Sequence, residues 1–530
     1  MLGCFAARNL MRYNLRVALL EKREDLCTGI SRANTAIIYS GCDTKPGTLK
    51  TSLCLKSAQG FSQLCADLGV RYSSCGSIMV SFGERGDGVL QKKLEQGIEN
   101  GVRGMKLLTR EEVLELEPNI AGNVHAGLYV PDTGTVMPWE LGLAAAENAV
   151  SNGADVLLNT EVTGVAGAGR PSGKWKVESG KLGTGDTGLF VSGECEVENG
   201  ELGTGDAGAS TAGFLVYTNN GTFFTRGIVN CAGMAADRIL EMFSEPTVRI
   251  VPTAGDYFVL DTKAAGQIRH VIFHEPEEKG KGLTLVPTVD GNILVGPTER
   301  PGDDFRTEAI GLEELRELVA QVIPTLPMEH VIRSFGAVRP NPQKLQITNY
   351  NLQITNKDEG TESEYVIDDM SISDFCIVES GDGACVSFVG VKTPGLTCAN
   401  ELGLYAAEKM AAFLGAADNP SFSPYRSPSV RLSDMSFEER ELFLQKEGPA
   451  SSRIICRCRG VSEGEIVDAI HRFPGATTLD GVKRRTGAGS GRCQGGFCAQ
   501  RVIEILAREL QCAPEDIMKD GENSYFFIRE

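Results

Sequence analysis

Four cysteines in the C-terminal part of the sequence are spaced as the ligands of a metal centre. Cys456 and Cys458 form one close pair, and Cys493 and Cys498 form a second. Four thiolates in two pairs fit a tetrahedral zinc ion or an iron–sulfur cluster. Glycines are concentrated around the second pair, in TGAGSGRCQGGFC (486–498), where backbone amides could approach the sulfurs and tune the potential of a cluster. The spacing therefore predicts a metal centre but does not decide between a zinc ion and an iron–sulfur cluster.

Arg339 is a candidate for binding an anion. It lies in FGAVRPN (335–341), where the following proline keeps its backbone extended. A planar guanidinium can hold a carboxylate or a phosphate at two points. The alternative is a surface salt bridge. Arg333, earlier in the same region, is a weaker candidate for the same role.

The elements that would position such groups begin at the N-terminal end of the sequence. Residues 4–13 are predicted to form a helix, and residues 16–20 (RVALL) a buried strand that ends at Glu21. In a dinucleotide-binding βαβ unit, a glycine such as Gly3 lets the helix pack on the strand, and an acid at the end of the second strand binds the ribose hydroxyls. The first strand and the first two glycines of G-x-G-x-x-G are absent. From these residues alone, a plain helix followed by a strand is an equally good interpretation.

The composition indicates a globular protein of about three domains. Of the 530 residues, 42% are hydrophobic and 23% are charged, which excludes extensive disorder and rod-like folds. The formal net charge of −18 excludes a broad nucleic-acid-binding surface. The sequence contains neither a recognisable signal peptide nor a transmembrane segment. We therefore expect a cytoplasmic protein, in which the cysteines outside the two pairs are packing residues rather than disulfides.

Some patterns are predicted to be structural only. Asp290-Gly291, between two strand-like segments, indicates a hairpin turn. The segment RHVIFHE (269–275) is expected to be a strand, which holds His270 and His274 too far apart to share a metal ion. We expect surface loops without an assigned function at two repeated sequences, ESGKLGTGDTG (178–188) with ENGELGTGDAG (198–208), and LQITN (345–349 and 352–356).

Several segments with strand and turn patterns are spread along residues 3–415. They are SRANTAIIYSGCDTKPGTLKTSL (31–53), LYVPDTGTVMPWELGLAAAENAVSNGADVLLNT (128–160), FTRGIVNCAG (224–233), AGDYFVLD (254–261), KGLTLVPTVDGNILVGPT (281–298), FGAVRPN (335–341), DFCIVE (374–379) and GVKTPGLTCA (390–399). In order and spacing the chain resembles the FAD-dependent oxidoreductases of the D-amino-acid-oxidase superfamily. The most similar groups are the L-2-hydroxyglutarate oxidases and the anaerobic-type glycerol-3-phosphate dehydrogenases.

This resemblance implies an FAD site and a site for an anionic substrate. Arg339 would bind the anionic end of that substrate. The family usually has a histidine near position 39, where this sequence has Tyr39. Tyr39 could form a hydrogen bond, but an ordinary pKa of about 10 makes it a poor base at neutral pH, so the catalytic base is not identified. The residues expected to bind FAD are Gly3, Glu21, Lys22, Ser31, Asn34, Val162, Ala232, Gly233, Gly390, Pro394, Gly395, Leu396 and Thr397.

The segment 454–510, which contains the four cysteines, resembles a second family. It is similar to the [2Fe–2S] domain of bacterioferritin-associated ferredoxin, which also occurs at the C-terminus of anaerobic-type glycerol-3-phosphate dehydrogenases. The resemblance implies that the cysteines hold a [2Fe–2S] cluster, with zinc as the alternative. Lys483, Arg484 and Arg485 are expected to form a solvated face. Helices are expected at about 463–473, 478–485 and 499–510.

Together these patterns predict an α/β protein. A Rossmann-like FAD-binding domain, with its first strand missing, would be interleaved with an α+β substrate domain and followed by a small helical [2Fe–2S] domain. The expected boundaries are 1–75, 136–240 and 370–415 for the FAD-binding domain, 76–135 and 241–369 for the substrate domain with an insertion near 343–366, 416–450 for a linker and helix, and 451–515 for the [2Fe–2S] domain.

The expected function is oxidation of a small anionic hydroxy compound, either glycerol 3-phosphate or a 2-hydroxy acid such as L-2-hydroxyglutarate. Electrons would pass from FAD through the cluster to a redox partner subunit or a quinone-linked acceptor, which could bring the protein to the membrane periphery. The alternative is a catalytically degenerate or truncated electron-transfer or assembly subunit. Because the first strand and its glycines are absent, we also expect weak FAD binding unless an upstream strand ending in Gly-Ala-Gly is added.

Overall fold

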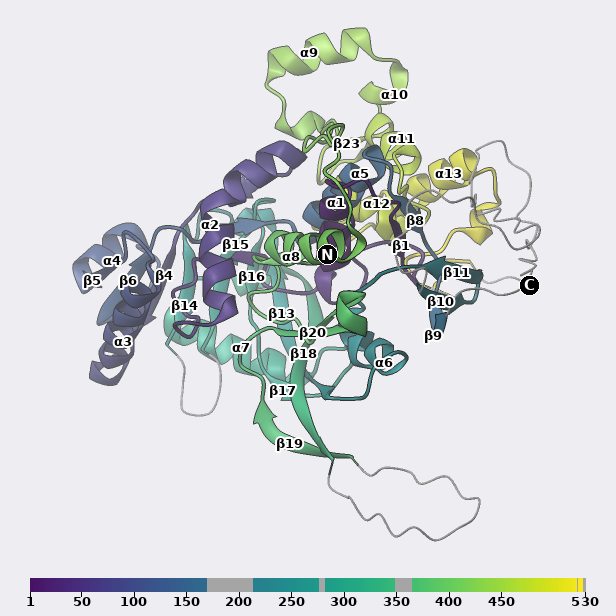
Figure 1. Ribbon diagram of the computed structural model, residues 1–530. Coiled ribbons are helices and arrows are strands. Elements are labelled where there is room, and N and C mark those ends of the chain that lie inside the picture. The colour runs from purple at the N-terminus through teal and green to yellow at the C-terminus, as the bar shows by residue number, and fades with distance from the viewer. Residues whose placement is uncertain (169–212, 276–281, 348–364, 522, 528–530) are drawn as a thin grey trace, which may run out of the picture.

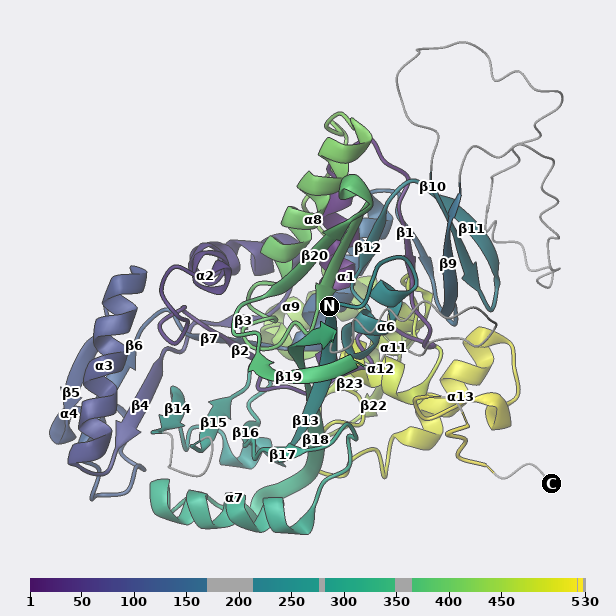
Figure 2. The ribbon, with the colours of Figure 1, turned by 60° about the horizontal axis from the view of Figure 1, so that its bottom comes forward.

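The computed structural model describes residues 1–168, 213–275, 282–347, 365–521 and 523–527. These residues form an α/β architecture in which several sheets are covered by helices (Figure 1). The C-terminal helices α11, α12 and α13 form a lobe at one side of the molecule (Figure 2).

In the predicted FAD-binding region, the strands that pair in parallel lie in two small sheets instead of one continuous sheet. Strand β1 (Ala18–Leu20) pairs in parallel with β8 (Asp155–Leu157). Strand β12 (Ile228–Asn230) pairs in parallel with β21 (Cys385–Val389), which pairs antiparallel with β20 (Cys376–Ser380). Among the described residues no ladder joins β1 to β12. In the described residues each of these two strands therefore has one edge without a ladder partner.

Helix α1 (Leu2–Leu10) contacts both of these sheets. It touches β1 and β12 and packs against α5 (Pro138–Ser151) and α8 (Ala399–Leu414). The approach of α1 to α8 depends on Gly403, where a Cβ atom would lie 2.7 Å from the carbonyl carbon of Phe5. The predicted N-terminal helix and the strand after it are thus both present.

A ten-stranded mixed sheet forms most of the predicted substrate domain. Its central ladder joins β13 (Val248–Leu260) and β18 (Val331–Ile347) in an antiparallel register that sets Thr253 opposite Arg339. Helix α7 (Ala309–Val322) packs along this sheet and contributes to its apolar core (Figure 2). The other strands of the sheet are β4 (Ser77–Ser81), β5 (Lys106–Thr109), β6 (Ala126–Val130), β14 (Val271–His274), β15 (Thr284–Pro287), β16 (Ile293–Val295), β17 (Arg300–Pro301) and β19 (Tyr365–Ser371).

Two three-stranded sheets and four helices complete the main body. One sheet contains β2 (Ile37–Ile38), β7 (Gly134–Val136) and β3 (Tyr72–Ser73). The other contains β9 (Val162–Ala168), β10 (Gly213–Thr218) and β11 (Gly221–Thr225). The helices are α2 (Leu49–Leu68), α3 (Glu84–Asn100), α4 (Arg110–Leu116) and α6 (Ala236–Glu241).

The C-terminal lobe has its own apolar core, in which side chains from α11, α12 and α13 meet. Helix α11 starts at a capping box, in which the Ser462 hydroxyl and the Glu465 carboxylate satisfy each other's backbone N–H groups. The three helices match the predicted ones. The elements of this part are α9 (Phe437–Lys446), α10 (Pro449–Ser452), β22 (Ile454–Cys456), β23 (Val461–Ser462), α11 (Glu463–His471), α12 (Leu479–Thr486) and α13 (Ala499–Leu510).

The structure bears on the remaining local predictions as well. Gly291 has φ +79° in the turn between the antiparallel strands β15 and β16, so the hairpin is confirmed. Residues 271–274 form strand β14, as expected. Both copies of the longer repeat and most of the LQITN repeat lie outside the described residues. None of the helices in the described part of the chain has the length and apolar character that a membrane crossing requires.

Candidate active site and cluster centre

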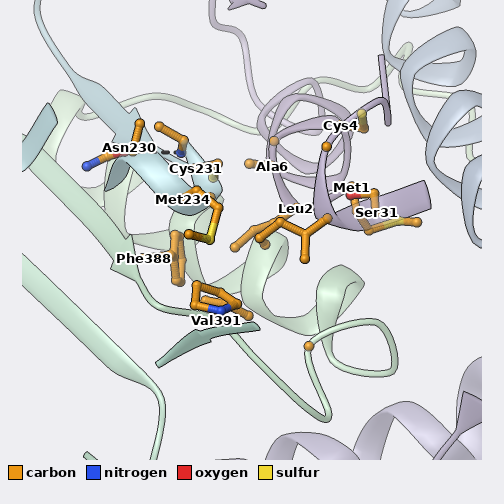
Figure 3. Close-up of a pocket in the computed structure, with 18 of the residues that line it drawn as sticks. Met1, Leu2, Cys4, Ala6, Ser31, Asn230, Cys231, Met234, Phe388 and Val391 are labelled. Carbon is orange, nitrogen blue, oxygen red and sulfur yellow. Dashed lines mark hydrogen bonds between the residues drawn. The ribbon is translucent and has the colours of Figure 1, made fainter. Parts of the chain in front are cut away.

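A large cavity extends from the gap between β1 and β12 to the ladder of β13 and β18. Its volume is about 3310 Å³, whereas pockets for drug-sized ligands occupy roughly 300–1,000 Å³. Leu2, Cys4 and Ala6 of α1 line one side, and Cys231 and Phe388 line the other (Figure 3). The cavity therefore has room for an extended dinucleotide together with a small substrate.

Gly3 and Glu21 occupy the positions expected of a dinucleotide site. A Cβ atom on Gly3 would lie 3.3 Å from Leu19 of β1, so a glycine favours close packing of helix on strand. Glu21 follows β1 directly and lines the cavity, where its carboxylate accepts a hydrogen bond of 3.0 Å from the backbone N–H of Arg23. Burial raises the pKa of Glu21, which fits an acid positioned to bind hydroxyl groups of a ligand.

Most of the other predicted cofactor residues also line this cavity. They are Lys22, Ser31, Asn34, Val162, Ala232, Gly233, Pro394, Gly395 and Leu396. The Asn34 side chain closes a local turn by accepting from the backbone N–H of Ala36 and donating to the carbonyl oxygen of Ser31. The direct contacts of these residues with FAD stay predictions.

Gly390 and Thr397 are placed differently, since neither lines the cavity. Gly390 has φ +67°, and a Cβ atom there would lie 2.7 Å from Pro342 of β18, so its role is to let the chain turn closely beneath that strand. Thr397 is fully buried, and its hydroxyl accepts a hydrogen bond of 2.9 Å from the backbone N–H of Tyr39. Both residues lie behind the residues that line the cavity and support their positions.

Arg339 reaches the same cavity from β18. Its Nη1 atom lies 3.2 Å from Glu299 Oε2, yet this buried nitrogen has no hydrogen-bond partner of suitable geometry among the described residues. The ring of Tyr257 lines the cavity beside it, and the Tyr257 and Phe335 rings stack with centroids 4.7 Å apart. Arg339 thus pairs with Glu299 and also lines the cavity in which an anion would bind. Arg333 is exposed and lies outside the cavity, so it does not share this role.

Two lysines in the cavity wall were not recognised from the sequence. Lys392 donates to Asn341 Oδ1 at 3.1 Å, and Lys50 donates to the carbonyl oxygen of Ser373 at 2.7 Å. Burial lowers the pKa of Lys392, and the positive charge of Arg339 lowers it further. Burial lowers the pKa of Lys50 to about 8, and Lys392 adds to that effect. Lys392 lies in the GVKTPG segment and could have been noticed from the sequence, whereas Lys50 lies in no recognisable motif.

Tyr39 lines the cavity but is not suited to act as a base. Burial raises the pKa of its hydroxyl above the ordinary value. Its ring lies 6.3 Å from that of Phe273, between centroids. We therefore assign it to packing and hydrogen bonding in the wall of the site.

The four cysteines of the C-terminal lobe come together as two pairs. The sulfurs of Cys458 and Cys493 are 3.6 Å apart. Cys456 and Cys498 form the other pair, in which the Cys498 thiol lowers the pKa of Cys456 to about 6. Backbone N–H groups, including that of Gly489, also point at the Cys456 sulfur. The pKa is thus lowered for one thiol of each pair, Cys456 and Cys493, and backbone amides point at both sulfurs, which fits an iron–sulfur cluster.

The paired arrangement is compatible with a binuclear cluster, which takes two thiolates at each iron.

The prediction of a solvated face is wrong for Arg484 and Arg485, because both side chains are buried. The Arg485 guanidinium binds both carboxylate oxygens of Asp25 at 2.8 Å, and Arg484 binds Asp25 Oδ2 at 2.7 and 3.0 Å. Burial alone would raise the pKa of Asp25, but the two guanidiniums outweigh it and hold this pKa below its ordinary value. Asp25 belongs to the loop after β1 that lines the cavity, so this contact joins the cluster lobe to the predicted FAD-binding loop.

The lobe also docks on the ten-stranded sheet. The hairpin residue Asp290 accepts from Arg459 at 2.9 Å and from Arg71 at 2.7 Å. Arg492 donates to Asp261, at the end of β13, at 2.9 Å. Arg459 and Arg492 each neighbour a cysteine that is predicted to be a cluster ligand, so these contacts hold the predicted cluster centre against the sheet that carries Arg339.

Comparison with known proteins agrees with this geometry. The family model described as FAD dependent oxidoreductase matches residues 1–408, and the model of the BFD-like [2Fe-2S] binding domain matches residues 454–508. The chain is 35% identical over 529 residues to a glycerol 3-phosphate dehydrogenase of Caloramator mitchellensis, covering 99% of this chain and 95% of that protein. It is 28% identical to the human mitochondrial L-2-hydroxyglutarate dehydrogenase over 56% of this chain and 58% of that one.

A solved structure shares the fold of the main body. The dithionite-reduced L-alpha-glycerophosphate oxidase of Mycoplasma pneumoniae, with FAD bound, superposes with a TM-score of 0.62 at 23% identity, covering 81% of this chain and 97% of that one. Together with the family matches, this accounts for the cavity and for the cysteine pairs. The chain therefore belongs to the FAD dependent oxidoreductase family, with FAD as its cofactor and a C-terminal domain that binds a [2Fe–2S] cluster.

Proposed function

We propose that this protein is a glycerol 3-phosphate dehydrogenase that delivers electrons through its own [2Fe–2S] cluster. The observation that carries the proposal is the group of three cations, Arg339, Lys392 and Lys50, in one part of the cavity. The near full-length similarity to a protein described as a glycerol 3-phosphate dehydrogenase supports it.

The charges of this group suit a phosphate better than a single carboxylate. Glu299 faces Arg339, and Asp374 accepts from the backbone N–H groups that start α2, including that of Lys50 at 2.9 Å. Three cations against these two carboxylates leave an excess of positive charge in a buried place. A dianion would remove that excess, and the Arg339 guanidinium could hold it at two points.

In this proposal, different residues of the cavity bind and shield the phosphate. Arg339 and Lys392 hold the phosphate, and Asn341 orients the Lys392 ammonium through the bond of 3.1 Å. The apolar rings of Tyr257 and Phe335 shield the ion pairs from water. FAD, when bound, supplies the acceptor for the hydride that leaves the carbinol carbon of the substrate.

The proposal can be tested by anaerobic reduction of the flavin. We expect glycerol 3-phosphate to bleach the visible flavin absorbance, and L-2-hydroxyglutarate to do so far more weakly. Lys392→Met should weaken the apparent affinity for glycerol 3-phosphate by about one to three decades, because one partner of a buried charge pair is lost. Lys409→Met is the matched control, since Lys409 is partly exposed and pairs with Glu379 on the surface.

The outcomes separate the two substrate classes. Rapid bleaching by L-2-hydroxyglutarate with none by glycerol 3-phosphate would contradict the proposal. So would equal affinities of the Lys392→Met and Lys409→Met variants for glycerol 3-phosphate.

A further inference from the structure

The two ligand pairs of the cluster centre differ in their exposure. Cys456 and Cys498 are 1% and 2% exposed, whereas Cys458 is exposed and Cys493 is half-buried. The Cys458–Cys493 pair therefore faces the outside of the lobe. A cluster held by the four thiols would have one edge close to the surface.

An aromatic ring stands at this edge. Phe497, between the ligands Cys493 and Cys498, is 86% exposed, the highest value among the large apolar side chains of the described residues. Its backbone N–H group points at the Cys493 sulfur, which keeps the residue next to the outer pair. Aromatic residues are enriched at the centre of protein interfaces.

Three arginines lie close in the sequence to the predicted cluster ligands and to Phe497. Arg457 lies between Cys456 and Cys458, Arg492 precedes Cys493, and Arg501 lies in the first turn of α13. All three are exposed, and within the described part of the chain neither Arg457 nor Arg501 forms an ion pair. Arg492 keeps its side chain 59% exposed although it pairs with Asp261. This positive patch stands out on a chain whose net charge is −18.

We propose that Arg457, Arg492, Phe497 and Arg501, here named the cluster lip, form the docking surface for a small acidic one-electron carrier protein. The proposal rests on the proposed function for the source of the electrons. An acidic carrier would be attracted to the lip and repelled by most of the remaining surface, which favours productive orientations. Phe497 would supply the apolar contact at the centre of a small interface.

The electron count fits such a partner. Oxidation of one glycerol 3-phosphate to dihydroxyacetone phosphate releases two electrons and two protons. Two carrier molecules each take one electron, and the protons go to the solvent. The lip therefore serves two successive encounters in each turnover, which a weak and rapidly exchanging interface allows.

A membrane surface fits the lip less well. The apolar side chains of α13, such as Val502 and Leu506, are buried in the core of the lobe, so this helix beside the lip presents no apolar face for insertion. Three arginines also fall short of the polybasic clusters of roughly four to eight cationic residues that bind anionic lipids.

The test measures binding to the holoenzyme without substrate. The probe is an acidic plant-type [2Fe–2S] ferredoxin, and its dissociation constant is measured by calorimetry at low and at high ionic strength. The double variant Arg457→Glu/Arg501→Glu should raise that constant at least about tenfold at low ionic strength, and the difference should disappear at high salt. Phe497→Ala should weaken binding at both salt concentrations. Visible absorbance checks that each variant retains its cluster.

The matched control reverses two arginines elsewhere. Arg103→Glu/Arg110→Glu changes the net charge equally, at exposed arginines near α4, which lies at the opposite end of the molecule from α13 (Figures 1 and 2). This control should bind ferredoxin as the wild type does.

Several results would overturn the proposal. They are the absence of ferredoxin binding tighter than about 1 mM by the wild type, an equal loss of binding in the control variant, a lip-dependent self-association in sedimentation, and lip-dependent binding of phosphatidylserine vesicles in place of ferredoxin. Failure of glycerol 3-phosphate to reduce the flavin would contradict the proposed function, while this binding result would stand by itself.

Discussion

Replacement of Asp25 by asparagine should loosen the cluster lobe from the FAD-binding loop. The Asp25 carboxylate accepts from two buried guanidiniums, those of Arg484 and Arg485, whose side chains are 6% and 5% exposed. An asparagine of the same size keeps the packing but removes the charge. It leaves two cations facing each other with a neutral partner between them.

The loss of stability in Asp25→Asn depends on the contacts that the two arginines retain. Removing one partner of a buried ion pair costs about 3–5 kcal/mol. Arg485 retains the carbonyl oxygens of Gly481 and Pro474, and Arg484 retains Asp520 at 2.7 Å, so we expect a cost near the lower limit. At about 1.4 kcal/mol for each decade, roughly 3 kcal/mol corresponds to a hundredfold larger open population of the interface.

Hydrogen exchange measures this population locally. Amides of helix α12 and of residues 21–28 should exchange up to about a hundredfold faster in Asp25→Asn if their protection depends on docking. The loop lines the cavity, so the affinity for FAD should fall as well. Asp520→Asn is the matched control, because the more exposed Asp520 binds only Arg484 of the buried pair, and we expect less than about 1 kcal/mol there.

The reasoning would be refuted by exchange rates in Asp25→Asn that match those of the wild type in both segments. It would also fail if Asp520→Asn had the larger effect. Adding Arg485→Met to Asp25→Asn should cost less than the sum of the two single changes, because the second change removes a cation that the first left unpaired.

Three further predictions follow from the sites. Arg339→Ala should lower kcat/KM for glycerol 3-phosphate by about two to three decades in steady-state assays, with partial recovery in Arg339→Lys because the two-point geometry is lost; an unchanged kcat/KM would disprove the assignment. Cys493→Ser should remove the rhombic EPR signal of the reduced cluster and spare the flavin spectrum, and stoichiometric zinc without iron in the wild type would contradict the cluster. The pKa of Asp25 is lowered in the folded state, so its contribution to stability is present above its unfolded pKa of about 3.9 and is lost as the pH falls through the folded value. Hydrogen exchange of the α12 amides should therefore accelerate over this acidic pH range in the wild type, and less steeply in Asp25→Asn.

Much of the site was predictable because its signals are local in the sequence. The spacing of Cys456, Cys458, Cys493 and Cys498 implied a metal centre without any structure. The strand that ends at Glu21 and the segment that carries Arg339 were equally readable, since each depends on neighbours a few residues away. The helices of the C-terminal lobe followed from apolar periodicity and were found where they were expected.

Other features depend on contacts between distant parts of the chain. The sequence of α12 shows three adjacent cations, and only the docking of Asp25, more than 450 residues earlier, decides that two of them are buried. The convergence of Lys50 and Lys392 on Arg339 likewise requires three separate elements to meet at one cavity.

The sequence by itself therefore predicted a metal centre at the four cysteines and several local helices and strands, because motifs and periodicities are properties of short segments, and its resemblance to known families implied the cofactors. The tertiary structure decided which charges are buried, which glycines shape the cavity wall rather than line it, and which edge of the cluster centre faces the solvent. The physical reason is that burial and pairing are set by packing between segments, and a pattern within one segment does not specify what will cover it.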